Sequence, residues 1–214
     1  KHRKCLFQTS WPKEIQQLAY EFLRNPVEVK YGESNVLNAN KAIKQNILMI
    51  KQGDKRDTLT KIMSEINPEG KPETLPKTII FTSTKSQCEQ LANELWNGGY
   101  AVDALHGDRQ QFQRTQVIGQ FKRGQLKLLV ATDVAARGLD VKDIACVINY
   151  DFPAGVNGAE DYVHRIGRTA RGGDSGLAYT FFTDSDSKRA RELIGILKRA
   201  EQDIPDELQR MDRG

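Results

Sequence analysis

The chain has 214 residues and a net charge of +4, with 38% hydrophobic and 28% charged residues. This composition is typical of a globular protein with one α/β domain and an additional segment, and no apolar run approaches the roughly 18 residues of a membrane-spanning helix. The small excess of Lys and Arg, 32 against 28 Asp and Glu, permits a nucleic-acid partner without requiring one.

Short apolar runs alternate with segments of helical periodicity along most of the chain. Residues 33–40 have the polarity of a linker, and we place a domain boundary there. The alternation predicts an α/β fold with a mostly parallel sheet covered by helices on both faces. The predicted strands are 46–50, 78–82, 101–105, 126–131, 146–150 and 177–182, and the predicted helices are 54–66, 86–97, 110–122, 159–168 and 186–200.

Polar clusters follow three of the predicted strands. STK (83–85) follows TIIF, HGD (106–108) follows AVDAL, and TD (132–133) follows LLVA. Each cluster alone is compatible with a helix cap or a turn. Because ligands collect at the carboxyl ends of parallel strands, three such clusters at one edge indicate a binding site.

The segment HRIGRTAR (164–171) places three arginines at a spacing of three residues. A solvated helix face would explain them, and so would phosphate binding, because a guanidinium group can donate two parallel hydrogen bonds to phosphate oxygens. The chain contains neither a GxxxxGK[ST] loop nor a GxGxxG fingerprint. We therefore expect half of a phosphate site, with the other half on a different domain.

Five segments in order resemble the motifs of one family. The chain resembles the C-terminal RecA-like domain of a DEAD-box ATP-dependent RNA helicase, in particular of the p68/Dbp2-like branch. This resemblance implies a RecA-like three-layer domain. The segments are TIIFTSTK (78–85), LHGDRQQFQR (105–114), LLVATDVAARGLD (128–140), VINYDFP (147–153) and YVHRIGRTARGG (162–173).

The resemblance implies that ATP with Mg²⁺ lies between two RecA-like domains and is held mainly by the first. Arg168 and Arg171 match arginine fingers, which stabilise negative charge on the γ-phosphate during hydrolysis. His164 matches a residue that couples the nucleotide side to the RNA side, and Arg165 is expected to form a structural or interdomain ion pair. Asp140 matches the residue that binds the ATP ribose, in a loop shaped by Arg137 and Gly138.

The resemblance also implies an RNA site at the strand ends. Hydroxyl groups, backbone amides and one Arg there would contact phosphates and 2′-hydroxyls, so binding should be independent of base sequence. Phe112 lies beside these residues and is predicted to pack inside the protein. The matching RNA-binding positions are Thr84, Lys85, Gly107, Asp108, Gln111, Arg114 and Thr132.

The resemblance divides the chain into a remnant of the first RecA-like domain (1–32), an interdomain linker (33–42) and the C-terminal domain (43–214). Gln8-Thr9-Ser10 stands where the family has Ser-Ala-Thr, which leaves the coupling of hydrolysis to unwinding open. An apolar stripe between Trp11 and Leu23 and the strand-like PVEVK (26–30) are expected to pack on a second copy, as a dimer, in preference to folding back.

The function implied is coupling of ATP binding and hydrolysis to RNA duplex unwinding, with this chain inactive on its own. Two alternatives remain open: a nucleotide-independent RNA-binding module, which the sequence upstream of Lys1 would reveal, and a DNA helicase, which RNA and DNA stimulation of ATPase activity would separate. Three widely spaced cysteines fit neither a disulfide framework nor a zinc site, so we expect no metal bound by this chain and an intracellular location. Between nucleus and cytoplasm, the resemblance favours the nucleus.

Overall fold

The computed structural model describes residues 19–23, 27, 37–136, 139–171 and 174–212. The chain forms two compact units, Lys1–Leu37 and Asn38–Gly214. In the first unit, residues 19–22 are helical. Gln8-Thr9-Ser10 and most of the apolar stripe and the PVEVK segment lie outside the described residues. The predicted remnant, linker and dimer therefore stay predictions.

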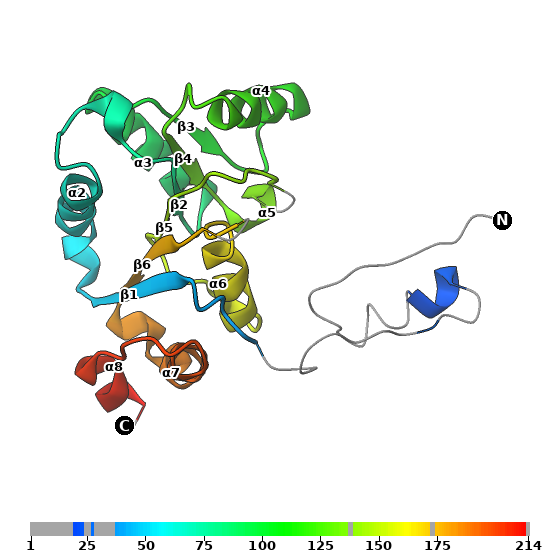
Figure 1. The fold of residues 1–214 in the computed structure, drawn as a ribbon, viewed down its shortest axis with the longest axis vertical. Helices are drawn as coiled ribbons and strands as arrows, with labels where there is room; N and C mark the ends of the chain where they lie inside the picture. The colour runs from blue at the N-terminus through cyan, green and yellow to red at the C-terminus, as the bar shows by residue number, and fades with distance from the viewer. Residues whose placement is uncertain (1–18, 24–26, 28–36, 137–138, 172–173, 213–214) are drawn as a thin grey trace. The chain divides into compact units, whose positions relative to one another are not determined.

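The second unit is built on six parallel strands in the order β1-β6-β5-β2-β4-β3 (Figure 1). This confirms the α/β fold class, with a sheet that is fully parallel where a mostly parallel one was predicted. In a parallel sheet the carboxyl ends of all strands lie on the same side, and the polar clusters of the sequence meet there. We call this side, formed by the carboxyl ends of the strands, the carboxyl edge of the sheet. The strands are β1 (Ile43–Met49), β2 (Thr78–Phe81), β3 (Val102–Leu105), β4 (Leu128–Ala131), β5 (Cys146–Asn149) and β6 (Gly176–Phe182).

Helices cover both faces of the sheet. Successive strand residues point to opposite faces, so Ile80 packs in the core formed with α2 (Lys55–Ile66) and α3 (Lys85–Asn97), while Ile79 packs in the core formed with α4 and α5. A third core lies under α6, α7 and α8 around Phe182. The opposite face carries α4 (Gln111–Lys122), α5 (Asp133–Ala136), α6 (Gly158–Ile166), α7 (Ala190–Arg199) and α8 (Asp206–Met211).

The start of β1 differs from the prediction. The strand begins at Ile43, three residues before the predicted start, although the first residues read Ile-Lys-Gln. The polar Gln45 is buried there because its side-chain oxygen accepts a hydrogen bond from the Tyr162 hydroxyl at 2.7 Å. A buried polar group with a partner is tolerated, so the polar residue does not end the strand.

The predicted helix at 186–200 is divided into two parts. Residues Asp184–Arg189 form the 3₁₀ helix η3, and α7 begins only at Ala190. At the start of η3, a carboxylate oxygen of Asp186 accepts hydrogen bonds from the amide and the hydroxyl of Thr183, at 2.9 and 2.8 Å. This cap fixes a tight first turn. The predicted helix at 159–168 ends at Ile166, and α5, α8 and the 3₁₀ helices η1 (Gln52–Asp54) and η2 (Pro72–Thr74) were not predicted.

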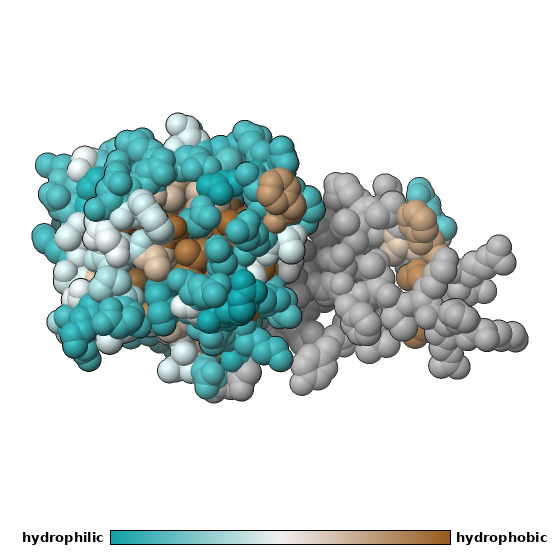
Figure 2. Space-filling model, turned by 90° about the horizontal axis from the view of Figure 1, so that it is seen from above, coloured by the Kyte–Doolittle hydropathy of each residue, from teal (hydrophilic) through white to brown (hydrophobic). Residues whose placement is uncertain are grey.

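The surface of the second unit is mostly hydrophilic, with apolar side chains showing between polar ones on the face in Figure 2. Among the described residues, no helix has both the length and the apolar character needed to cross a membrane.

Candidate nucleic-acid and nucleotide interface

The loops after β2, β4 and β3 lie next to one another because these strands are neighbours in the parallel sheet. All seven residues predicted to bind RNA lie in these loops or in the first turns of α3 and α4. Amide groups at a helix N-terminus point outward and carry a partial positive charge. This edge of the sheet therefore presents several backbone donors together with the polar side chains.

The start of α3 faces the loop after β3. Thr84 is the N-cap of α3, and its hydroxyl accepts a hydrogen bond from the Gln87 amide at 3.2 Å. The next residue, Lys85, forms an ion pair with Asp108, which follows the exposed Gly107. The hydrogen bond from Lys85 lowers the pKa of Asp108 below its ordinary value. A phosphate that binds Lys85 would have to compete with this carboxylate.

The first turn of α4 carries Gln111 and Arg114 on one side. A guanidinium nitrogen of Arg114, Nη1, donates to the Gln111 side-chain oxygen at 3.3 Å. The Nε of Arg114 is buried and has no hydrogen-bond partner among the described residues. The guanidinium group of an Arg at a helix N-terminus is suited to a phosphate oxygen, although in this structure the Nε atom of Arg114 is not accessible to one.

The prediction that Phe112 packs inside the protein is wrong, because 63% of this residue is exposed. The buried residues of α4 are Val117 and Phe121. At 3.6 residues per turn, Phe112 lies about 140° and about 180° around the helix from them. The helix therefore turns Phe112 away from the core.

Thr132 lies between β4 and α5. Its amide donates to the Leu105 carbonyl at 3.1 Å, and its own carbonyl accepts from the amides of Ala135 and Ala136 at 3.2 and 3.1 Å. Only 8% of Thr132 is exposed. Its backbone is used to end the strand and begin the helix, so this structure presents little of the residue to solvent.

A carboxylate that the sequence analysis did not identify supports the loop after β3. Glu89 on α3 contacts His106 Nε2 at 2.6 Å and accepts a hydrogen bond from Arg109 Nε at 3.1 Å. Partial burial raises the pKa of Glu89, but the hydrogen bond with His106 and the charge of Arg109 outweigh it, so the pKa lies below its ordinary value. The sequence held one indication of such a carboxylate: His106 and Arg109, which flank Gly107-Asp108, are both side chains that commonly pair with an acidic residue.

Arg165 forms an ion pair inside this domain. Its Nε and Nη2 donate to the two carboxylate oxygens of Asp133 at 2.5 and 2.6 Å, and its Nη1 donates to the Asp151 carbonyl at 2.6 Å. The guanidinium also lies 5.1 Å from the ring centre of Phe81, and Arg165 is only 2% exposed. Arg165 therefore lies neither on a solvated helix face nor free for a phosphate. It forms a buried ion pair that links α6 to the loop after β4.

Arg168 and Arg171 converge on one carbonyl. Nη1 of each donates to the Leu139 oxygen, at 3.4 and 3.5 Å, and Arg171 Nε donates to the Gly167 oxygen at 3.1 Å. Burial, and then the charge of Arg171, lowers the pKa of Arg168. Within the described residues, neither guanidinium forms an ion pair with a carboxylate. Two neighbouring cations without an acidic partner are suited to an anionic ligand.

The other residues predicted for the nucleotide side are placed less completely. Asp140 is exposed and follows Leu139, the residue whose carbonyl both arginines contact, whereas Arg137 and Gly138 lie outside the described residues. His164 is 39% exposed in its side chain, and its Nε2 lies 4.0 Å from Glu160 Oε1, one helical turn earlier. In the described part of the chain, no group of three or more His, Cys, Asp or Glu side chains could hold a metal ion.

Comparisons with known proteins agree with this geometry. Residues 54–173 match the family described as helicase conserved C-terminal domain. The chain is 47% identical over 211 residues to DEAD-box ATP-dependent RNA helicase 46 of Arabidopsis thaliana and 45% identical over 208 residues to ATP-dependent RNA helicase DBP2 of Scheffersomyces stipitis. These matches cover 99% and 97% of the chain but 31% and 38% of the relatives, so the chain spans about a third of the curated relatives it matches.

Solved structures show the same likeness. The chain matches Dbp5 of S. cerevisiae bound to RNA and ADP BeF3 with a TM-score of 0.74 and 30% identity, over 97% of this chain and 52% of that one. It matches the structure of the C-terminal domain of the DEAD-box protein Dbp5 with a TM-score of 0.62 and 37% identity, over 74% of this chain and 85% of that one.

Proposed function

The chain belongs to the helicase conserved C-terminal domain family and is a RecA-like C-terminal domain of the DEAD-box RNA helicases, and from this we propose that it forms one half of an ATP-dependent RNA helicase. In this proposal it binds the RNA backbone and supplies arginine fingers to an ATP site that another RecA-like domain completes. Closure of the two domains on ATP and RNA destabilises the duplex, and hydrolysis resets the open state.

One observation carries the nucleotide side of the proposal. Arg168 and Arg171 direct their guanidinium groups to the same carbonyl, that of Leu139, without a carboxylate partner in the described part of the chain. Preorganised cations of this kind stabilise the charge that develops on a transferred phosphoryl group. In this proposal Asp140, which is exposed and follows Leu139, accepts a hydrogen bond from the ribose. Mg²⁺, in the same proposal, is held mainly by the other domain.

The edge formed by the loops after β2, β4 and β3 supports the RNA side. Its donors are helix N-termini, hydroxyl groups and the guanidinium of Arg114, which recognise phosphates and 2′-hydroxyls and do not read base edges. Binding should therefore be independent of base sequence. Without the other domain, we expect the chain to show no RNA-stimulated ATPase activity.

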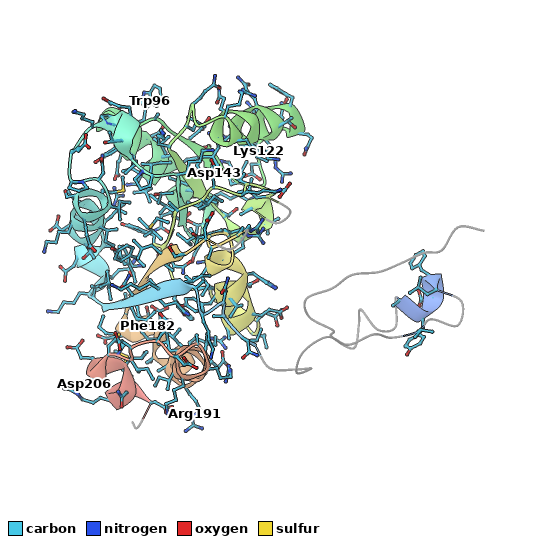
Figure 3. All side chains as sticks on the ribbon, in the orientation of Figure 1. Trp96, Lys122, Asp143, Phe182, Arg191 and Asp206 are labelled. Atoms are coloured by element: carbon cyan, nitrogen blue, oxygen red, sulfur yellow. The ribbon has the colours of Figure 1, made fainter. Side chains whose placement is uncertain are left out.

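Kinetics of a two-domain helicase that contains this chain would test the proposal. Arg168→Ala and Arg171→Ala should each lower kcat by roughly 10³ or more with ATP binding little changed, because a finger acts chiefly in the transition state. Arg191→Ala is the control, since its side chain is 84% exposed on α7 (Figure 3) and forms an ion pair with Asp212. A rise in KM alone would show that the two arginines bind the ground state and are not fingers.

Salt dependence would test the RNA side. Arg114→Ala should weaken binding to single-stranded RNA equally for all base sequences and reduce the slope of log affinity against log salt by about 0.7, the value of one phosphate contact. An unchanged slope would place Arg114 in the fold and not on the RNA.

A further inference from the structure

Asp151 lies two residues beyond the end of β5, next to the loop after the neighbouring strand β2. It is 9% exposed, and both of its carboxylate oxygens are used. Oδ1 accepts a hydrogen bond from Lys55 Nζ at 2.6 Å, and Oδ2 accepts one from the Ser83 amide at 2.9 Å. Ser83 immediately precedes Thr84 and Lys85 in the loop after β2, so the carboxylate holds the backbone from which these two side chains extend.

The backbone of Asp151 holds a second loop. Its carbonyl accepts a hydrogen bond from Arg165 Nη1 at 2.6 Å, and the same guanidinium grips both carboxylate oxygens of Asp133. Asp133 follows Thr132 at the end of β4. Asp151 is therefore connected to two loops of this site, directly to the loop after the neighbouring strand β2 and, through Arg165, to the loop after β4, one strand further along the sheet.

Lys55, the first residue of α2, is the cation that keeps the Asp151 carboxylate in place. Its side chain is 6% exposed, that of Asp151 is 12% exposed, and the ammonium group lies 5.4 Å from the Tyr150 ring centre. Taking both charges out of water costs several kcal/mol per ion, and an apolar pair of similar volume is often as stable or more stable. Stability alone therefore does not explain why the chain has a buried ion pair at this place. A role in orienting the Ser83 amide, which donates to Asp151, does explain it.

We propose that Asp151, held by Lys55, is a positioning residue for RNA binding that fixes the Ser83–Lys85 loop and, through Arg165, the Thr132–Asp133 loop. This inference rests on the proposed function, because it assumes that RNA binds at this edge. Asp151 itself is covered by its partners and does not touch the RNA. Its effect is to hold the Ser83 backbone in one orientation, so that Thr84 and Lys85 are ordered before RNA binds.

Three measurements on this chain would test the proposal: the urea midpoint of unfolding, amide exchange at Ser83 by NMR, and binding of a short fluorescein-labelled single-stranded RNA by anisotropy. Asp151→Asn should lower the urea midpoint, because it leaves the Lys55 charge buried without its anion. The double variant Lys55→Met, Asp151→Leu removes both charges and should regain most of that midpoint. In this double variant the Ser83 amide hydrogen should still exchange faster than in the wild type. The variant should also bind RNA about fivefold more weakly than the wild type, which is the effect of one lost hydrogen bond.

Asp143→Asn is the matched control. Asp143, labelled in Figure 3, also pairs with a lysine, Lys77, at 2.5 Å. It lies before β5, however, and therefore at the amino ends of the strands, away from the proposed RNA site. It should change neither Ser83 exchange nor RNA affinity. A double variant that binds RNA as tightly as the wild type would overturn the inference, and so would unchanged Ser83 exchange. If the wild-type chain bound no RNA, the proposed function would fail first, and the inference with it.

Discussion

Replacing Asp133 by Ala would remove both oxygens that hold the Arg165 guanidinium. Arg165 would keep only its hydrogen bond to the Asp151 carbonyl, a longer contact of 3.5 Å to Asn149 Oδ1 and its position over Phe81. The arginine is 2% exposed, so water cannot replace the lost carboxylate without opening the loop. The substitution therefore leaves a buried cation without its anion.

The expected cost follows from the burial of each partner. Removing one partner of a buried ion pair costs about 3–5 kcal/mol. The Asp133 side chain is 30% exposed, so water already screens part of this interaction and we expect the lower end, about 3 kcal/mol. For a unit of this size, that corresponds to a fall in Tm of about 6–12 °C. Arg165→Met should cost less, about 1–2 kcal/mol, because it leaves a carboxylate that water can reach.

Urea unfolding of the two single variants and the double variant would measure these costs as a thermodynamic cycle. The double variant should be more stable than Asp133→Ala alone, because it no longer contains the unpaired buried charge of Arg165. Two results would refute the reasoning. One is a loss below about 1 kcal/mol for Asp133→Ala, which is the range of an exposed pair. The other is simple additivity of the two single losses.

Three further predictions concern other parts of the second unit. The pKa of Glu89 is lowered by His106, so its charge contributes stability above the ordinary pKa of about 4.3 and loses it as pH falls through the folded value. Glu89→Gln should lower the urea midpoint at neutral pH, and this loss should become smaller as the pH falls below about 4.3, because the wild-type carboxylate then takes up its proton. A loss that is the same at neutral and at acidic pH would show that the charge of Glu89 does not contribute. Gly158→Ala would place a Cβ atom 2.6 Å from the Pro153 carbonyl oxygen, so thermal unfolding should show a loss of about 1–3 kcal/mol, and an unchanged Tm would contradict this close approach. Burial raises the pKa of Cys146 to about 12, so iodoacetamide should label it only after unfolding in urea, and mass-spectrometric detection of label on the folded protein would disprove its protection.

Local sequence pattern was sufficient for most of the sheet, because its central strands are short, apolar runs. The run 128–131 is fully buried and has no polar residue to confuse its assignment. The start of β1 was missed because burial of Gln45 depends on Tyr162, a residue 117 positions away. The short helix α5 was missed because four residues are too few to show helical periodicity.

The candidate site was predictable in its location and not in its internal contacts. Residues that follow parallel strands must meet at the carboxyl ends of those strands, which is why the clusters at 83–85, 106–108 and 132–133 were expected to form one site, whereas Arg114 was identified through the family resemblance. Which strands are neighbours is not encoded in periodicity, and that order decides which loops can touch. The contact of Asp151 with Ser83 exists because β5 lies beside β2, and its contact with Lys55 joins residues 96 positions apart, so both became visible only in three dimensions.

The strand order also has a consequence for synthesis of the chain. Among the described residues β1 pairs with β6, with Ile43 opposite Gly176, so the first strand of this sheet in chain order is paired with its last. At typical synthesis rates the intervening residues take about ten seconds to make. During that time the apolar Ile43 and Ile47 have no partner strand, and an unpaired strand of this kind is a site for association with other chains. We therefore expect residues 43–49 to remain an unpaired strand until residues 176–182 are available to pair with them.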